Sequence, residues 1–145
     1  MTNAKHNTSH QTLRYLPEWP KFRGTGIGVI GAGFIVRDCH LVAYADAGFH
    51  VLGMTSRNLD RAAEAAALRG VPRVYESVEA MLSDSSIEVV DIAVPPLAQP
   101  RIIQTILERG KYVRGILAQK PLAMSLPEAE ALVHACEKAG ILLQV

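Results

Sequence analysis

In this 145-residue chain, the first residues with a pattern that suggests a chemical role are two glycines. Gly31 and Gly33 follow residues 27–30, which are small or β-branched and are typical of a buried strand, and an apolar helical pattern begins directly after them. A strand that turns on glycines into the start of a helix gathers free backbone N–H groups and partial positive charge at one point. This turn, with Phe34 and Ile35 at the helix start, is therefore a candidate phosphate-binding site.

Two glycine registers are possible at this turn. The spacing Gly26-x-Gly28-x-x-Gly31 matches the G-x-G-x-x-G string, but no strand precedes it. In this register the loop would also take in residues 27–30, which form the only strand pattern nearby. The spacing Gly31-x-Gly33-x-x-Val36 follows a strand and opens a helix, as phosphate binding requires. We therefore favour the second register, with an ordinary glycine turn as the alternative.

The end of the next predicted strand offers a second group of polar side chains. Ser56 can hydrogen-bond a ribose or phosphate oxygen, and Arg57 can pair with a 2′-phosphate and stack on adenine. An acid that would bond the ribose 2′-hydroxyl of NAD is missing here, since Asp60 already belongs to the following helix. The pair favours NADP over NAD; the alternative is a turn serine beside a solvated charge.

Two further segments follow predicted strands. Val94, Pro95 and Pro96 hold a rigid path where the middle of a dinucleotide would pass, although a plain loop is equally consistent with them. Lys120 follows the next strand, and its ammonium group can hydrogen-bond a substrate hydroxyl or take part in proton transfer. An exposed surface charge is the alternative for Lys120.

The elements that must position these residues alternate between strand and helix along the chain. Strands are expected at residues 27–30, 51–55, 74–75, 88–94, 112–118 and 141–145, with helices over 34–47, 58–69, 77–83, 100–109 and 125–139. Glycines at the helix ends fit the C′ position, namely Gly48, Gly70, Gly110 and Gly140. The strands are continuous apolar runs, as in buried parallel sheets. The pattern predicts a doubly wound, mostly parallel α/β sheet of Rossmann type, in three α/β/α layers.

Two expectations concern the packing of single residues. On the first helix, Ile35, Cys39, Val42 and Ala43 recur near one face and are expected to point toward the core. Cys39 and Cys136 stand apart, without the spacing of metal ligands, so we expect no metal site and read each as a small buried hydrophobe.

Composition limits the classes of function. The chain is 49% hydrophobic and 20% charged with a net charge of +1, as in soluble globular domains. It has no basic stripe with interleaved aromatics, and no apolar run of the ~18 residues that a membrane span needs, so neither nucleic acid nor membrane is an expected partner. Without a signal-peptide pattern, a cytoplasmic protein is expected. Residues 1–24 are expected to be disordered or extended, and residues 25–145 to form the domain, which stops within its sixth strand.

Together, four segments in one order resemble the Gfo/Idh/MocA oxidoreductases: residues 27–35, Ser56-Arg57 with Arg61-Ala62, residues 91–96 and residues 119–122. The resemblance covers about residues 26–145, the nucleotide-binding half of that family. It implies an NADP or NAD cofactor, with contacts at Gly31, Gly33, Phe34, Ile35, Ser56, Arg57, Val94, Pro95, Pro96, Gln119, Lys120 and Pro121. It also implies that Lys120 is catalytic beside the nicotinamide and that the Lys120–Pro121 bond is cis.

The chain departs from the family's usual residues at three positions. Pro96 stands where Asn is usual, Gln99 where His is usual, and Gln119 where Glu is usual. Gln119 keeps the shape of Glu without its charge, which leaves the tuning of Lys120 and the substrate class open. His40 falls where relatives often carry His, and we expect a packed, hydrogen-bonded histidine rather than a catalyst.

The resemblance implies hydride transfer to or from a hydroxyl-bearing carbon of a sugar, polyol or related small molecule, by a homo-oligomer. The family's second α/β domain, which supplies substrate contacts, is absent from this chain, so the chain alone is expected to bind dinucleotide without turnover. The alternative is a non-catalytic dinucleotide-binding module or a truncated gene product. A Rossmann methyltransferase fits less well, because Lys-Pro after the fifth strand is foreign to that class.

Overall fold

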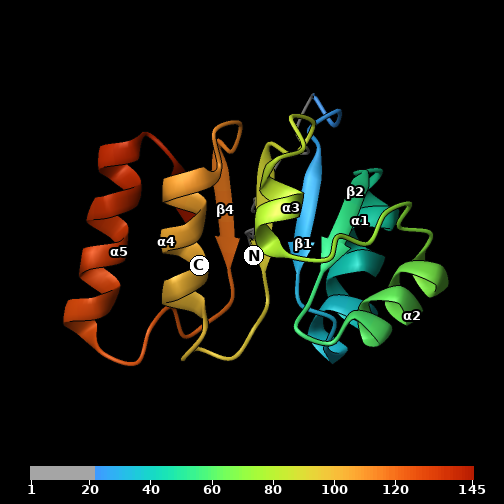
Figure 1. The fold of residues 1–145 in the computed structure, drawn as a ribbon, viewed down its shortest axis with the longest axis horizontal. Coiled ribbons are helices and arrows are strands. Elements are labelled where there is room, and N and C mark those ends of the chain that lie inside the picture. The colour runs from blue at the N-terminus through green and yellow to red at the C-terminus, as the bar shows by residue number, and fades with distance from the viewer. Residues whose placement is uncertain (1–21) are drawn as a thin grey trace, which may run out of the picture.

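The computed structural model describes residues 22–145, so most of the segment predicted to be disordered or extended lies outside the described residues (Figure 1). The elements follow in the order β1 (Ile27–Ile30), η1 (Ile35–His40), α1 (Leu41–Ala47), β2 (Val51–Thr55), α2 (Leu59–Arg69), α3 (Val78–Leu82), β3 (Val89–Ile92), α4 (Gln99–Arg109), β4 (Gly115–Ala118), α5 (Leu126–Ala139) and β5 (Leu142–Gln144). The strands after β2 are shorter than the sequence pattern predicted.

The strands form one sheet in the order β2-β1-β3-β4-β5, and every pair is parallel. The doubly wound Rossmann-type fold predicted from the alternating pattern is confirmed. The strand expected at residues 74–75 is reduced to one parallel bridge, in which Val74 pairs with Met54 of β2. The reason is space: Gly70 ends α2 and Ser77 already caps α3, which leaves a short crossing segment between them.

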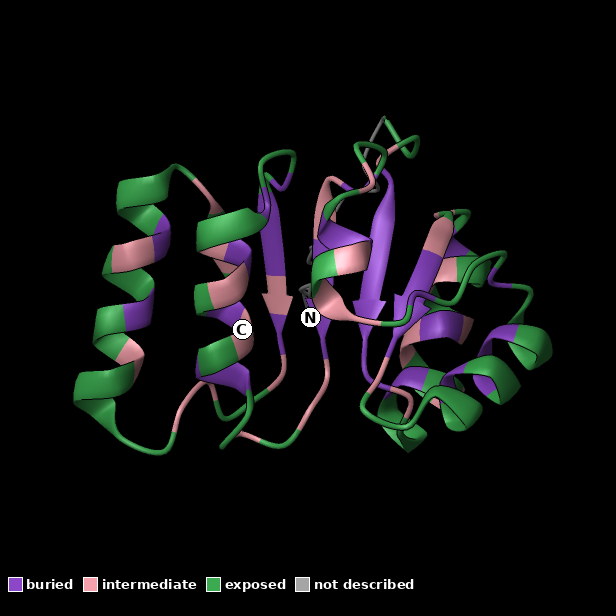
Figure 2. Ribbon diagram, in the orientation of Figure 1, coloured by how far each residue is buried: buried purple, intermediate pink, exposed green. Residues whose placement is uncertain are grey.

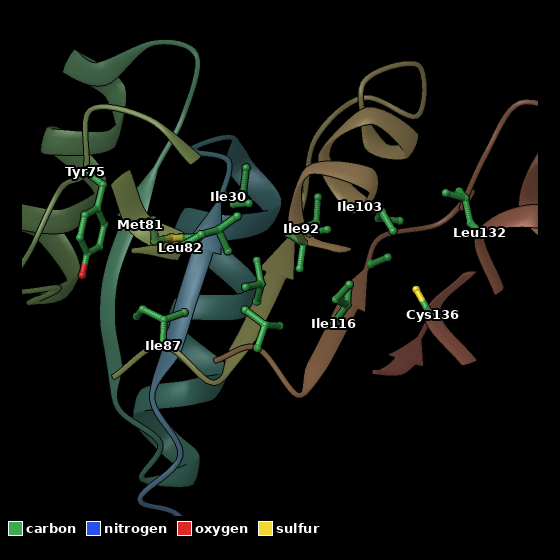
Figure 3. Close-up of a cluster of buried hydrophobic side chains, with 14 residues drawn as sticks. Ile30, Tyr75, Met81, Leu82, Ile87, Ile92, Ile103, Ile116, Leu132 and Cys136 are labelled. Carbon is green, nitrogen blue, oxygen red and sulfur yellow. The ribbon is translucent and has the colours of Figure 1, made fainter. Parts of the chain in front are cut away.

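Two hydrophobic clusters show that the sheet is covered on both faces. One cluster lies under α3, α4 and α5 and includes Met81, Ile103 and Leu132 (Figure 3). The other lies under η1, α1 and α2 and includes Val36 and Ala62. β1, β2, β3 and β4 are buried along most of their length, whereas the edge strand β5 and the outer faces of the helices are largely exposed (Figure 2). These clusters make the three layers that the sequence predicted.

The glycines at the helix ends fall into two classes. Gly48, Gly70 and Gly140 have φ values of 72°, 70° and 69°, the left-handed conformation that the C′ prediction requires. Gly110 ends α4 as predicted, but it does not adopt the left-handed conformation, since its φ is −79°. Glycine is needed there for a close approach, because a Cβ atom would lie 2.6 Å from the carbonyl oxygen of Ile106.

The first helix presents a different face to the core from the one predicted. It opens as the π-helix η1, in which hydrogen bonds join residues five apart. The buried residues are consequently Val36, Leu41 and Ala47. Of the residues expected to face the core, Ile35, Cys39 and Ala43 are exposed and Val42 is half-buried. The expectation that Cys39 is buried is therefore wrong, whereas Cys136 is buried as expected. Within residues 22–145, the helices are too short or too polar to cross a membrane.

Substitution of Gly31 tests the tight turn after β1. Its φ is +126°, and a Cβ atom would lie 2.3 Å from the carbonyl oxygen of Ala93. We expect Gly31→Ala to lower the free energy of unfolding by about 3 kcal/mol, because backbone strain and a clash with main chain combine. Urea denaturation followed by circular dichroism measures the change.

Gly33→Ala is the matched control in the same turn. A Cβ atom at Gly33 meets nothing within 4 Å, and its φ is not positive, so the free energy of unfolding should change by no more than about 0.5 kcal/mol. Equal destabilisation by the two variants would contradict this description of the turn.

Candidate functional site

Parallel register brings the carboxyl ends of β2, β1, β3 and β4 into one row. The strands pair so that Ile30 lies beside Thr55 on one side and beside Ile92 on the other, and Ile92 lies beside Ala118. Neighbouring strands lie about 4.8 Å apart, so Ile30 and Ala118 are separated by roughly 10 Å. The four segments predicted to do chemistry therefore leave the sheet at the same edge.

Backbone hydrogen bonds extend this row by one residue. The N–H of Gly31 donates to the carbonyl oxygen of Thr55 at 2.8 Å, that of Ala93 to Ile30 at 2.9 Å, and that of Gln119 to Ile92 at 2.9 Å. The first residue of each loop is fixed by the sheet itself. The positions of the loops are therefore set by the fold rather than by loop flexibility.

A cleft of about 610 Å³ opens at this edge, where β2 and β3 flank β1. The chain leaves β1 toward β2 and later returns to β3 on the other side of β1, so the cleft lies where a doubly wound sheet binds ligands. Of the predicted cofactor contacts, six line the cleft: Gly31, Gly33, Ser56, Arg57, Val94 and Pro95. The other six lie outside its lining: Phe34, Ile35, Pro96, Gln119, Lys120 and Pro121.

The glycine turn forms one wall of the cleft. Gly28 lies within β1, which supports the register that begins at Gly31. At the start of the helix, the N–H of Arg37 donates to the carbonyl oxygen of Gly33 at 2.9 Å. Among residues 22–145, no side chain caps the N-terminus at Phe34. The amides between Gly31 and Arg37 are thus free of capping side chains and stand at the positive end of the helix.

The opposite wall carries two arginines. Ser56 Oγ donates to the carbonyl oxygen of Asn58 at 2.5 Å, and Asn58 Oδ1 accepts from the N–H of Arg61 at 3.0 Å, which caps α2. Arg57 and Arg61 are exposed and line the cleft. Arg61 was not among the predicted contacts. It lies in the first turn of α2, and Arg57 lies just before that helix, so both are near the same helix N-terminus. The predicted contacts also omitted Glu76 and Ser77, which line the cleft after the Val74 bridge.

The segment around Lys120 is held by Gln99. The Gln99 side chain is fully buried, and its Nε2 donates to the carbonyl oxygens of Gln119 at 2.7 Å, Pro121 at 3.1 Å and Leu122 at 3.1 Å. The Lys120–Pro121 bond is cis, as the resemblance implied, and Lys120 is exposed. The side-chain amide of Gln99 therefore acts as the hydrogen-bond donor that holds this loop.

A buried acid lies beneath the same edge. Asp91 is fully buried in β3, and its Oδ2 lies 2.7 Å from His40 Nδ1 and accepts from the Tyr44 hydroxyl at 2.9 Å. Burial raises the pKa of Asp91, while the contacts with His40 and Tyr44 act to lower it. Burial and the adjacent Asp91 carboxylate raise the pKa of Tyr44. His40 is the packed, hydrogen-bonded histidine that the sequence predicted.

The contact between Asp91 and Tyr44 was not predicted from the sequence. An acid inside an otherwise apolar strand is the signal that could have found them, because a buried carboxylate requires hydrogen-bond donors. Within residues 22–145, no group of three or more His, Cys, Asp or Glu side chains is placed to hold a metal ion.

Comparison with known proteins identifies the family to which this chain belongs. Residues 25–145 match the family model GFO_IDH_MocA, described as an oxidoreductase family with an NAD-binding Rossmann fold. The chain is 32% identical over 126 residues to D-apiose dehydrogenase from Paraburkholderia graminis, which covers 86% of this chain and 32% of that protein.

Two solved structures show the same fold with dinucleotides bound. GenD2 from gentamicin A biosynthesis in complex with NAD superposes with a TM-score of 0.77 at 25% identity, covering 89% of this chain and 36% of that one. A mutant 3-ketoreductase from Actinomadura kijaniata in complex with TDP-benzene and NADP gives 0.71 at 30% identity, covering 81% and 35%. The chain spans about a third of the length of these relatives. It belongs to the Gfo/Idh/MocA family of oxidoreductases, whose NAD-binding Rossmann domain it forms.

Proposed function

We propose that the cleft binds NADP, and that the chain serves as the nucleotide-binding part of an oxidoreductase acting on a sugar, polyol or related compound. The observation that supports this most directly is the glycine turn. Gly33 lines the cleft at a helix N-terminus, with open space where a Cβ atom would stand.

The residues present fit a dinucleotide along the whole edge. The pyrophosphate would lie against the amides after Gly31, where partial positive charge and unpaired N–H groups favour an anion. Val94 and Pro95 would contact the middle of the cofactor, because they line the cleft beside that turn. The nicotinamide would extend toward the loop of Gln119, Lys120 and Pro121, at the neighbouring strand end. Phe34, Ile35 and Pro96 would then lie at the rim.

Charge supports NADP over NAD. Arg57 and Arg61 offer guanidinium groups on the wall formed by the end of β2 and the start of α2, where a 2′-phosphate would lie. The residue after Thr55 is Ser56 rather than an acid, so nothing at that position repels a phosphate. Among the solved neighbours, one is a complex with NAD and another a complex with NADP.

The reaction proposed is oxidation of a hydroxyl-bearing carbon, or the reverse. A bound nicotinamide supplies hydride transfer. Lys120 Nζ would hold the substrate hydroxyl and accept or return its proton, since its side chain is exposed and Gln99 holds the carbonyl groups of its two neighbours, Gln119 and Pro121. A carbohydrate-like substrate is inferred from relatives named D-apiose dehydrogenase and 3-ketoreductase.

Titration of the chain with NADPH and NADH tests the cofactor preference. We expect NADPH to bind more tightly, and Arg57→Ala to weaken NADPH binding about tenfold, or about 1.4 kcal/mol, but NADH binding less, because only NADPH carries the 2′-phosphate. Isothermal titration calorimetry measures both affinities. Arg109→Ala, at the opposite end of α4 from the cleft edge, is the control and should change neither affinity.

Equal affinities for the two cofactors in the unmodified chain, both unaffected by Arg57→Ala, would contradict the proposed NADP preference. Dinucleotide binding itself would still stand in that case, because the glycine turn and not Arg57 would carry it.

Gly33→Ala tests the glycine turn as the phosphate site. A methyl group there would occupy the open space against which the pyrophosphate is proposed to lie, so NADPH and NADH affinities should both fall tenfold or more. The fold should keep its stability, which separates loss of binding from loss of structure. Unchanged affinity for both cofactors would place the phosphates elsewhere.

A further inference from the structure

The contacts of His40 form a chain that runs from the centre of the sheet to the proposed catalytic loop. Its ring joins Asp91 in β3 to Gln119 at the end of β4, with His40 Nδ1 2.7 Å from Asp91 Oδ2 and His40 Nε2 2.9 Å from Gln119 Nε2. The ring is only partly exposed, with 17% of its side chain accessible, while Asp91 is fully buried.

The partners of Asp91 decide which ring nitrogen carries the proton. An ionised carboxylate only accepts hydrogen bonds, so His40 Nδ1 must donate to Oδ2 beside the Tyr44 hydroxyl, which donates to the same atom. In a neutral imidazole the other nitrogen, Nε2, then carries a lone pair. That lone pair faces the side-chain amide of Gln119, which can donate an N–H to it.

Gln119 is consequently fixed at three points. Its backbone N–H donates to Ile92, its carbonyl oxygen accepts from Gln99 Nε2 at 2.7 Å, and its side chain reaches His40. Gln99 also bonds the carbonyl of Pro121, so Lys120 lies between two restrained residues. Within residues 22–145, the exposed Lys120 side chain makes no hydrogen bond of its own, so the position of Lys120 follows from the restraint of its neighbours.

We propose that His40 is a positioning residue for Lys120: Asp91 holds it as the Nδ1–H tautomer, and its Nε2 lone pair anchors the Gln119 amide. Gln119 suits this arrangement because its amide donates a hydrogen bond. A carboxylate at that position has no proton to give, and pairing it with His40 requires a second proton on Nε2. The importance of Lys120 rests on the proposed function; the tautomer and the anchoring do not.

Nuclear magnetic resonance of the cofactor-free chain tests the tautomer. In a long-range ¹H–¹⁵N spectrum with labelled histidine, and with His40→Leu to identify the signals, we expect Nδ1 of His40 to be protonated and Nε2 to be bare. Gln119→Glu should add a proton on Nε2. The exposed His50 and His134 are internal controls and should be unchanged.

A proton on Nε2 with a bare Nδ1 in the unmodified chain would overturn the proposal, since Asp91 would then be the donor. An unchanged His40 spectrum in Gln119→Glu would also overturn it.

Amide hydrogen exchange tests the positioning step. In His40→Leu, the Gln119 amide should exchange at least tenfold faster, whereas the amide of Ile116 within β4 should keep its rate. A parallel change at both amides would show a general loss of stability and no positioning role, and no change at Gln119 would equally refute the anchor. Because neither measurement uses a cofactor, a chain that shows the expected tautomer but binds no NADPH would contradict the proposed function alone.

Discussion

Parallel register is the constraint on which the rest of the structure depends. Because Thr55, Ile30, Ile92 and Ala118 are aligned across neighbouring strands, each following loop starts from the same edge. Segments far apart in the sequence thereby become neighbours at that edge. The glycine turn, the arginine wall and the Lys120 loop are consequences of that alignment, and a strand that slipped by one residue would turn its buried side chains to the wrong face.

The few buried polar side chains of the described residues lie beneath this edge. The buried polar or charged side chains of residues 22–145 are Thr55, Asp91 and Gln99. Burial of such groups is costly without hydrogen bonds. Asp91 and Gln99 use theirs to hold His40 and the Lys120 loop, while Asp91 Oδ1 and Gln99 Oε1 find no partner within the described residues. An apolar pair would stabilise the core more simply, so their placement supports a role at the edge.

The sequence predicted the architecture well because its signals are local and repeated. Apolar strands and the glycines at helix ends each follow from a few neighbouring residues, and in the structure the side chains of Asn58, Ser77 and Ser125 cap the helices that start after them. It failed where packing decides: the π-helical turn rotated the first helix, and the expected strand at residues 74–75 had too little length between two helices.

The candidate site shows the same division. The glycine turn and Ser56-Arg57 were predictable, because strand ends define them. Arg61 and Glu76 were not among the predicted contacts, since they reach the cleft from a helix and from a crossing segment. The partnership of Asp91, His40 and Gln119 joins three elements, and no spacing along the chain reveals it.

The central claim, that a dinucleotide lies along the carboxyl edge of the sheet, can be measured by following backbone amide signals while NADP is added. We expect the largest shifts at Gly33, Ser56 and Val94, with small shifts at Gly48 and His50 on the opposite edge. Shifts concentrated at that opposite edge, or none at any NADP concentration, would contradict it.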